Sequence, residues 1–595
     1  MTTTTTTRGS PILGAVVLAA GAAYALTAAR QILGGDNGEF ATLAATGGVA
    51  HPPGYPLYVG YLRALSWLPA SSPAHNASLS TAILGVVSVA LVQRASMAWG
   101  ASAFAAALVS SVYAFAPLTW QLATHAEAFT LNAVLALVIV TLSAPRCSIE
   151  PTLRVALLGL TAGLGLSNHH SIVLLAPLGL FAAVSAVRAA PRRALAVAYG
   201  VAGIVLGLTP YAYLVHAARH ARDATWVWGD TSDFRGLCHH FLRVDYGTTE
   251  LGISSHERAP LAHLAALGTR LFTDYLALPG IAALGCGVWL YAQRRAKAPI
   301  AVSGAKLAMV ASFVLAGPLF VSWFNLPPRH IGALIAERFY LLPAALLAVL
   351  AAPAFDQLMP TIATRPRMAL PLVALSGVVA ALLAFPSVRE HHRPTVELYV
   401  RNALAIAPSN AIILGTGDHR FGAFLYARYA LGLRPDVVFI NPRLLLGDWY
   451  PPRISRQLGL EVERGKGKDR VLDAAALTVQ MLGTRRAIFF TDWFATGLDR
   501  SLPSYPLGPL IRIVPRASDV PEPHALLALN LDVDAQLELE PSPPSSPRTW
   551  AGDIAADYAR PWRVLANAFR SQDDPERASM CERRARELVP WLAAP

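Results

Sequence analysis

The sequence predicts a polytopic α-helical membrane protein that carries a separate C-terminal α/β domain, and three observations support this prediction. Of the 595 residues, 54% are hydrophobic and only 14% are charged, whereas soluble globular proteins carry about 25% charged residues. Long apolar runs fill the chain up to residue 389 and then stop. The length also exceeds what one hydrophobic core holds, which is about 250–300 residues.

The apolar runs are long enough to cross a membrane. A helix needs about 20 mostly apolar residues to span a bilayer, and this criterion predicts about 11 transmembrane helices. The first run could instead be a signal peptide, because the small residues of Ala25–Ala29 resemble a cleavage site. The runs lie at residues 11–29, 77–93, 101–118, 128–144, 153–167, 171–187, 194–214, 276–293, 305–324, 338–355 and 368–386.

The basic residues orient these spans. If Arg8 is cytoplasmic, the loops on its side contain thirteen basic residues but only two acidic ones, Glu150 and Asp356. Cytoplasmic loops show this bias. An odd number of spans then places residues 390–595 outside the cytoplasm, and all sixteen histidines fall on that outer side. We therefore expect an integral multi-pass protein of the cytoplasmic (inner) membrane whose chemistry lies outside.

The net charge of +12 belongs to the membrane part of the chain. Residues 390–595 contain 25 basic and 24 acidic residues, which leaves 24 basic and 13 acidic residues for 1–389. Because membrane topology explains this surplus, it argues against a nucleic-acid partner. The four cysteines lie too far apart for a zinc site or a dense disulfide framework.

These patterns predict two domains. A membrane domain at 1–389 has long polar outer loops at 30–76, 216–274 and 325–337, and an extracytoplasmic soluble domain occupies 390–595.

Short strands alternate with helices in the soluble domain, which predicts a small parallel sheet. The helical run Phe421–Leu431 follows the first strand, and a Pro/Ser-rich linker at Glu540–Pro547 precedes two polar helices at 551–571 and 574–592. The expected strands are Ala411–Gly415, Asp436–Asn441 and Ala487–Thr491. Asp418 and Asp492 follow strands, where open α/β sheets bind ligands, but aspartate is also a common turn residue.

The first outer loop carries the most informative polar residues. Asp36 and Glu39 lie three residues apart, so a helical turn would place both carboxylates on one side. A proline-rich segment from His51 to Tyr55 follows and rigidifies the approach to Tyr58. The alternative is a solvated connector whose acids stabilise the N-terminus of the next helix.

Polar residues also lie at the outer ends of later spans. Glu127 lies at the mouth of a span, where it either faces a wet cavity or stabilises a helix N-terminus. His169 and His170 are adjacent on a tight hairpin. Neighbouring histidines on a turn diverge and no acid is near, so a metal site is the less favoured interpretation.

Two arginines and one Trp-Gly-Asp motif complete the set of candidates. Arg329 and Arg338 are placed to hold a phosphate, because a guanidinium binds phosphate oxygens bidentately. The alternative for Arg338 is pairing with Glu337 or with lipid headgroups. Trp226 or Trp228 either stacks on a sugar or anchors the chain at the membrane interface, and Asp230 follows them as a candidate sugar or acceptor contact.

In this order the motifs resemble the transmembrane protein O-mannosyltransferase-like family and its bacterial relatives, which belong to the GT-C superfamily of polytopic glycosyltransferases. The resemblance covers residues 11–250, and Phe129 stands where family members commonly have tyrosine. The matching motifs are Asp36-Asn37-Gly38-Glu39, His51-Pro52-Pro53-Gly54-Tyr55-Pro56, Trp120 with Glu127, Asn168-His169, and Trp228-Gly229-Asp230 with Tyr246-Gly247.

The resemblance implies a GT-C fold and transfer of a sugar, such as mannose, from a polyprenyl-phosphate-linked donor to a hydroxyl of a protein or glycan, with inversion. Asp36, with Glu39 beside it, is implied as base or acceptor ligand. No cofactor beyond the lipid-linked donor is expected, and a divalent metal has no support. The residues implied at the donor phosphate are His51, His169, Arg329 and Arg338, and those at the acceptor or sugar are Tyr55, Tyr58, Glu127, Trp228 and Asp230.

Two other functions fit the same sequence. A transporter or flippase of lipid-linked sugars would place ionisable groups near the bilayer midplane, whereas the acids here gather at one surface. That distribution favours an enzyme that faces the surface. A non-catalytic subunit of an envelope assembly could keep the same loops, and the sequence does not separate it from an enzyme.

Overall fold

The computed structural model describes residues 11–222, 224–248, 250, 258–275, 300–326, 328–358, 366–462, 480–492 and 502–591. The predicted span at 276–293 lies outside these residues. The described chain forms two compact units. We call the first, Met1–Arg30, Val49–His220 and Thr231–Arg389, the membrane unit, and the second, Gln31–Gly48, Ala221–Asp230 and Glu390–Pro595, the sheet unit.

Apolar helices build the membrane unit, as the hydropathy pattern predicts. By length and composition, six helical stretches among the described residues can cross a membrane. They are Pro73–Ala98, His170–Ala189, Arg193–Arg219, Gly304–Ser322, Ile331–Gln357 and Leu370–Ile406, of which the last extends in sequence into the sheet unit. The helices α5 (Ala103–Phe115) and α6 (Pro117–Ala123) form a further bent pair, and α1 (Pro11–Thr27), α7 (Ala128–Leu142) and α8 (Pro151–Leu166) are shorter apolar helices. Each predicted run within the described residues thus coincides with an apolar helix.

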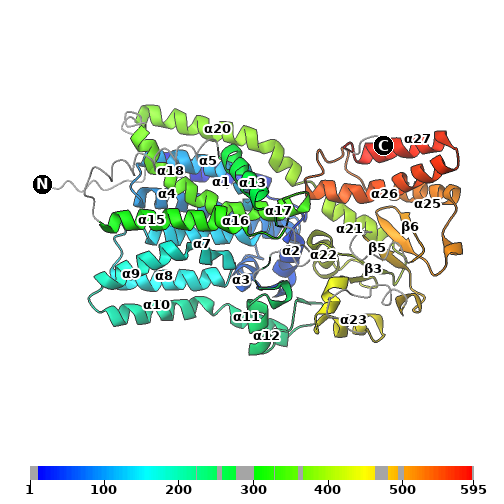
Figure 1. Cartoon of the computed structure of the whole chain (residues 1–595), viewed down its shortest axis with the longest axis horizontal. Coiled ribbons are helices and arrows are strands. Elements are labelled where there is room, and N and C mark those ends of the chain that lie inside the picture. The colour runs from blue at the N-terminus through cyan, green and yellow to red at the C-terminus, as the bar shows by residue number, and fades with distance from the viewer. Residues whose placement is uncertain are drawn as a thin grey trace. The chain divides into compact units, whose positions relative to one another are not determined.

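Glycines set the closest helix packing in the membrane unit. The helix α10 (Arg193–Leu208) lies alongside α8 (Figure 1). A Cβ added at Gly203 would lie 2.5 Å from the Ala156 carbonyl oxygen, and one at Gly207 would lie 2.5 Å from that of Leu160. Small residues of this kind let membrane helices approach closely and gain van der Waals contact.

A five-stranded mixed sheet lies at the centre of the sheet unit, in the order β4-β3-β5-β7-β6. The parallel strands β3 (Ile412–Leu414), β4 (Val438–Ile440) and β5 (Ile488–Phe490) confirm the prediction of three alternating strands. The antiparallel strands β7 (Leu510–Ile513) and β6 (Ser504–Leu507) were not predicted.

Helices cover this sheet. After β3 come α22 (Asp418–Leu425) and the π-helical turn Tyr426–Ala430, where one helical run was predicted. The two predicted C-terminal helices are α26 (Trp550–Ser571) and α27 (Pro575–Leu588), which pack on each other (Figure 1). The unit also contains α21 (Thr395–Ile406), α23 (Tyr450–Leu458) and α25 (Pro523–Gln536).

The sheet unit includes part of the first predicted outer loop. The helix α2 (Asn37–Thr46) packs against α22 within this unit.

The other helices of the membrane unit are α3 (Pro56–Ala64), α4 (Pro73–Ala98), α9 (Ala176–Ala189), α11 (Tyr211–Arg219), α12 (Phe234–Phe241), α13 (Pro260–Asp274), α15 (Ile300–Val314), α16 (Phe320–Ser322), α17 (Ile331–Glu337), α18 (Leu341–Leu358) and α20 (Pro366–His391).

Candidate functional site

Asp36 occupies a distinctive position in the sheet unit. Every residue from Ile32 to Ala44 is buried except Asp36, which is half-buried. Asp36 is the N-cap residue of α2, yet its carboxylate makes no capping hydrogen bond. The expected alternative therefore lacks a capping hydrogen bond at Asp36, although the carboxylate still lies at the N-terminus of α2, where the helix dipole favours an acid.

Local contacts hold the segment before Asp36 in place. The Leu33 amide donates to Asn37 Oδ1 at 2.7 Å, which closes a tight turn around Asp36. The next turn begins with the Phe40 amide, which donates to the Asp36 carbonyl oxygen at 3.0 Å. Glu39 lies in that turn and is 5% exposed. The glycine-rich sequence thus presents one carboxylate while the surrounding backbone stays buried.

A loop in the membrane unit presents His51 and Tyr55. Gly54 has φ +95° and its Cβ position would lie 2.5 Å from Leu214 Cδ1, so the chain requires glycine there. Next to it, His240 Nε2 lies 3.0 Å from the Ala50 carbonyl oxygen. Burial lowers the pKa of His240 to about 3, so the ring stays neutral.

Aromatic and imidazole rings connect this loop to the hairpin of His169. His51 Nε2 is 3.1 Å from Tyr55 Oη, and the ring centroids of Tyr55 and His169 are 5.9 Å apart. The His169 ring in turn lies 4.8 Å from the Phe129 ring. These residues come from three separate segments, and the membrane unit brings them together.

The hydrogen bonds of His169 fix its tautomer. The Ser171 amide donates to His169 Nδ1 at 3.1 Å, so Nδ1 is an acceptor and the proton of the neutral ring lies on Nε2. Burial, followed by the positive charges of neighbours that include Arg243 and Arg338, holds the pKa of His169 well below its ordinary value. His169 is therefore a neutral N–H donor.

Glu127 and Arg338 form a buried ion pair at the same place. Arg338 Nη1 donates to Glu127 Oε1 at 3.0 Å, and the two side chains are 12% and 1% exposed. The Arg338 guanidinium also lies 5.5 Å from the centre of the Phe129 ring. Arg338 thus pairs with Glu127, whereas Glu337, the partner considered from the sequence, pairs with Arg270.

Other predicted residues lie elsewhere. Tyr58 is fully buried beside Glu127, and its hydroxyl is 2.7 Å from Thr81 Oγ1. Arg329 is exposed. Trp228 belongs to the sheet unit, where it is 6% exposed, and Asp230 is exposed.

Two residues outside the predicted set join the cluster in the membrane unit. The Tyr246 ring lies 6.4 Å from the His51 ring, and the Arg243 guanidinium lies 5.3 Å from the centre of the Tyr246 ring. Their signal in the sequence was the Arg243-Val244-Asp245-Tyr246 motif of the second long loop, which also fits an interfacial anchor. We call His51, Tyr55, Glu127, His169, Arg243, Tyr246 and Arg338 the cationic cluster.

The composition of the cationic cluster favours an anion. It holds two guanidinium groups and one carboxylate, and its neutral His169 adds an N–H donor. Arginine recognises phosphate through planar, bidentate hydrogen bonds. Among the residues that the structure describes, no group of three or more His, Cys, Asp or Glu side chains is placed to hold a metal ion.

Sequence comparisons relate the chain to protein O-mannosyl-transferases. The family model of the protein O-mannosyl-transferase TMEM260 N-terminal domain matches residues 36–190. The chain is 29% identical over 469 residues to protein O-mannosyl-transferase TMEM260 of Mus musculus, covering 75% of this chain and 64% of the relative. It is 27% identical over 246 residues to the Dictyostelium discoideum protein of the same name, covering 38% of this chain and 30% of the relative. The chain therefore spans less than two thirds of each relative's length.

Solved structures show the same fold at low identity. ArnT from Cupriavidus metallidurans in the apo state matches with a TM-score of 0.53 and 15% identity, covering 85% of this chain and 98% of that one. ArnT bound to undecaprenyl phosphate matches with a TM-score of 0.51, 14% identity and the same coverage. The chain is thus a polytopic α-helical membrane protein with the GT-C fold, as predicted. It resembles the transmembrane protein O-mannosyltransferase-like family, which confirms the resemblance stated from the motifs.

Proposed function

We propose that this chain is a membrane glycosyltransferase that moves a sugar from a polyprenyl-phosphate-linked donor to an acceptor hydroxyl outside the cytoplasm. The observation that carries the proposal is the cationic cluster, in which two guanidinium groups lie near a neutral imidazole N–H, a combination suited to binding phosphate. The names of the sequence relatives, protein O-mannosyl-transferases, support the reaction class and suggest mannose. The undecaprenyl phosphate bound by one structural neighbour supports a lipid-linked donor.

In the proposed mechanism Asp36 is the general base. Its carboxylate takes the proton of the acceptor hydroxyl while the hydroxyl oxygen attacks the anomeric carbon. The bond between that carbon and the phosphate oxygen breaks, and its electron pair leaves with the polyprenyl phosphate. A single displacement of this kind inverts the anomeric configuration.

The cationic cluster would stabilise the departing phosphate. Arg243 and Arg338 supply positive charge, and His169 Nε2–H donates a hydrogen bond without needing to be protonated. His51 and Tyr55 would orient the donor headgroup next to them. Tyr58 supports Glu127 from a buried position, and we leave Arg329, Trp228 and Asp230 as candidate contacts of the donor or acceptor.

The decisive test measures transfer by the purified full-length protein. Detergent-solubilised protein receives a polyprenyl-phosphate mannose labelled in the sugar, together with a serine- and threonine-rich peptide, and both labelled peptide and released polyprenyl phosphate are counted. Asp36→Asn keeps shape but removes basicity, so we expect transfer to fall by about 10²–10⁴-fold. Glu150→Gln is the matched control, because that carboxylate is exposed and caps α8. Full activity of Asp36→Asn would refute the assignment of the base.

Further arms of the same assay address the finer points. Polyprenyl-phosphate glucose and a polysaccharide acceptor test the sugar and the acceptor class, and the anomeric configuration of the product tests inversion. Sealed vesicles loaded with labelled donor test the alternative function of a transporter or flippase of lipid-linked sugars. Movement of intact donor across the bilayer with no cleavage would favour a flippase and overturn the proposal.

A further inference from the structure

We infer that the C-terminal domain positions Asp36 through a crossing of α2 and α22 at which two glycines are in contact. This inference rests on the proposed function and deepens it. The relevant contacts all lie within the sheet unit, which joins Gln31–Gly48 to Glu390–Pro595. Gly422, Trp550 and Glu397 are then positioning residues, because they touch the backbone that carries Asp36.

The crossing of α2 and α22 leaves no room for side chains. A Cβ at Gly38 would lie 2.6 Å from the backbone carbon and oxygen of Gly422. A Cβ at Gly422 would lie 3.2 Å from the Glu39 amide nitrogen. The two backbones therefore touch directly, two residues after Asp36. Because backbone atoms cannot rotate away as side chains can, this contact fixes the helix position closely.

Two further contacts hold the chain before Asp36. The ring of Trp550, the first residue of α26, covers Gly34, where an added Cβ would overlap the ring. The Ile32 amide donates to Glu397 Oε2 at 3.1 Å. The C-terminal domain thus contacts the segment at Ile32, at Gly34 and at Gly38, on both sides of Asp36.

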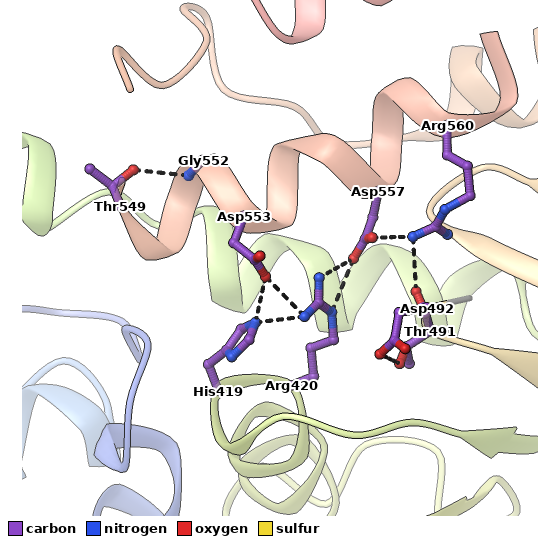
Figure 2. Close-up of polar contacts among 9 residues, drawn as sticks. All are labelled: His419, Arg420, Thr491, Asp492, Thr549, Gly552, Asp553, Asp557 and Arg560. Carbon is purple, nitrogen blue, oxygen red and sulfur yellow. Dashed lines mark hydrogen bonds and ion pairs between the residues drawn. The ribbon is translucent and has the colours of Figure 1, made fainter. Parts of the chain in front are cut away.

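A buried charge network ties α22 to α26, which carry two of these contacts. Figure 2 shows Arg420 of α22 between Asp553 and Asp557 of α26, with N···O distances of 2.9 and 2.8 Å. Asp557 also pairs with Arg560, so two positive charges balance two negative ones. Arg420 and Asp557 are 8% and 4% exposed, so losing one partner would leave a buried charge unbalanced.

The network continues to Trp550. His419 Nε2 lies 2.9 Å from Asp553 Oδ2 (Figure 2), and the His419 ring lies 5.1 Å from the Trp550 ring. Burial raises the pKa of Asp553, but the positive charge of Arg420 and the hydrogen bond with His419 outweigh burial and hold that pKa below its ordinary value. The charged network and the Trp550 ring that covers Gly34 are therefore one connected structure.

The first test grades the displacement of α2. Gly38→Ala forces a larger shift than Gly422→Ala, because its Cβ contact is shorter. A misplacement of about 1 Å can cost about 10²-fold in rate, so we expect kcat to fall about 10²-fold for Gly38→Ala and about tenfold for Gly422→Ala. The KM for the donor should change by less than about threefold. Rates are divided by the measured fraction of protein that binds donor, so that misfolded protein does not lower the kcat. Gly60→Ala is the control, because nothing lies within 4 Å of that Cβ position.

The second test does not depend on chemistry. Hydrogen exchange of the full-length protein reports the backbone amides of residues 32–40. Asp557→Asn should increase their exchange by at least about tenfold, whereas Asp574→Asn, at the half-buried N-cap of α27, should not. Trp550→Ala should act like Asp557→Asn, and Trp550→Phe should restore much of the protection.

The outcomes separate this inference from the proposed function. If Asp36→Asn stays active, the proposed base is wrong, and the positioning role falls with it. If Asp36→Asn is inactive but Gly38→Ala and Asp557→Asn leave both kcat and exchange of residues 32–40 unchanged, the positioning inference is overturned while the base stands. Graded losses of kcat together with increased exchange support it.

Discussion

The buried pair of Glu127 and Arg338 allows a quantitative test of the membrane unit. Its atoms are 3.0 Å apart, and neutralising either partner strands the other in a buried site. At an effective dielectric constant of about 20, two unit charges at this distance attract by about 5–6 kcal/mol. Part of this attraction offsets the cost of taking both charges out of water, so breaking the pair should cost about 3–5 kcal/mol.

The two single substitutions should differ. Arg338→Gln leaves Glu127, which is 1% exposed, whereas Glu127→Gln leaves Arg338, which is 12% exposed and can better reach water. We therefore expect Arg338→Gln to be the more destabilising change. The double variant leaves no stranded charge, so its cost should be close to that of one single variant, which corresponds to a coupling energy of about 3–5 kcal/mol.

The four proteins would be compared by SDS-induced unfolding in mixed micelles, followed by circular dichroism. The surface pair Arg516–Asp519, whose side chains are 77% and 28% exposed, is the control cycle, and we expect little or no coupling energy there because water screens the pair. If the Glu127–Arg338 cycle gave less than about 1 kcal/mol, or if the single costs simply added, the pair would be screened by water and the argument for a buried charge cluster would fail.

Three further predictions concern the membrane unit. Burial lowers the pKa of His240 from 6.5 to about 3, so as the pH falls the unfolded chain takes up a proton on this ring before the folded chain does. The free energy of unfolding should therefore fall as the pH drops from about 6.5 toward 3. His240→Gln should flatten that part of a pH-dependent unfolding series, and an unchanged slope would contradict the prediction. Gly203→Leu should abolish the close packing of α8 and α10 and lower the folded yield in size-exclusion chromatography, whereas Gly60→Leu should not. His169→Gln keeps a side-chain donor and should retain about 10–100-fold more transfer activity than the ring-retaining His169→Phe, and equal activities would exclude the proposed N–H donor.

Local patterns explain what the sequence could predict. A membrane span requires only an uninterrupted apolar run, so the described helices coincide with the predicted runs. The strands β3, β4 and β5 were likewise short apolar runs followed by turn residues. The hairpin of β6 and β7 escaped prediction because Pro506 lies inside β6, and proline in a run argues against a strand.

Contacts between distant segments could not be predicted. Nothing near Arg338 in the sequence points to Glu127, which lies 211 residues earlier, and the adjacent Glu337 was the more obvious partner. The packing of Gly38 on Gly422 had no signal either, because a glycine in a helix usually only weakens it. Such contacts depend on tertiary structure, and they are the ones that shape the candidate site.

The charge of the cationic cluster bears on how the proposed reaction would be accelerated. A polyprenyl-phosphate sugar is a phosphodiester with one negative charge, whereas the departing phosphate is a monoester that carries about −1.5 to −2 at neutral pH. Arg243 and Arg338 outweigh the single carboxylate of Glu127, and the neutral His169 adds a donor. Such a cluster binds the developing charge more strongly than the donor itself, and only interactions that strengthen toward the transition state raise the rate. In the proposed reaction the Glu127 carboxylate would then have a specific role, because it holds the Arg338 guanidinium in place and would keep the cluster from binding the phosphate product too tightly.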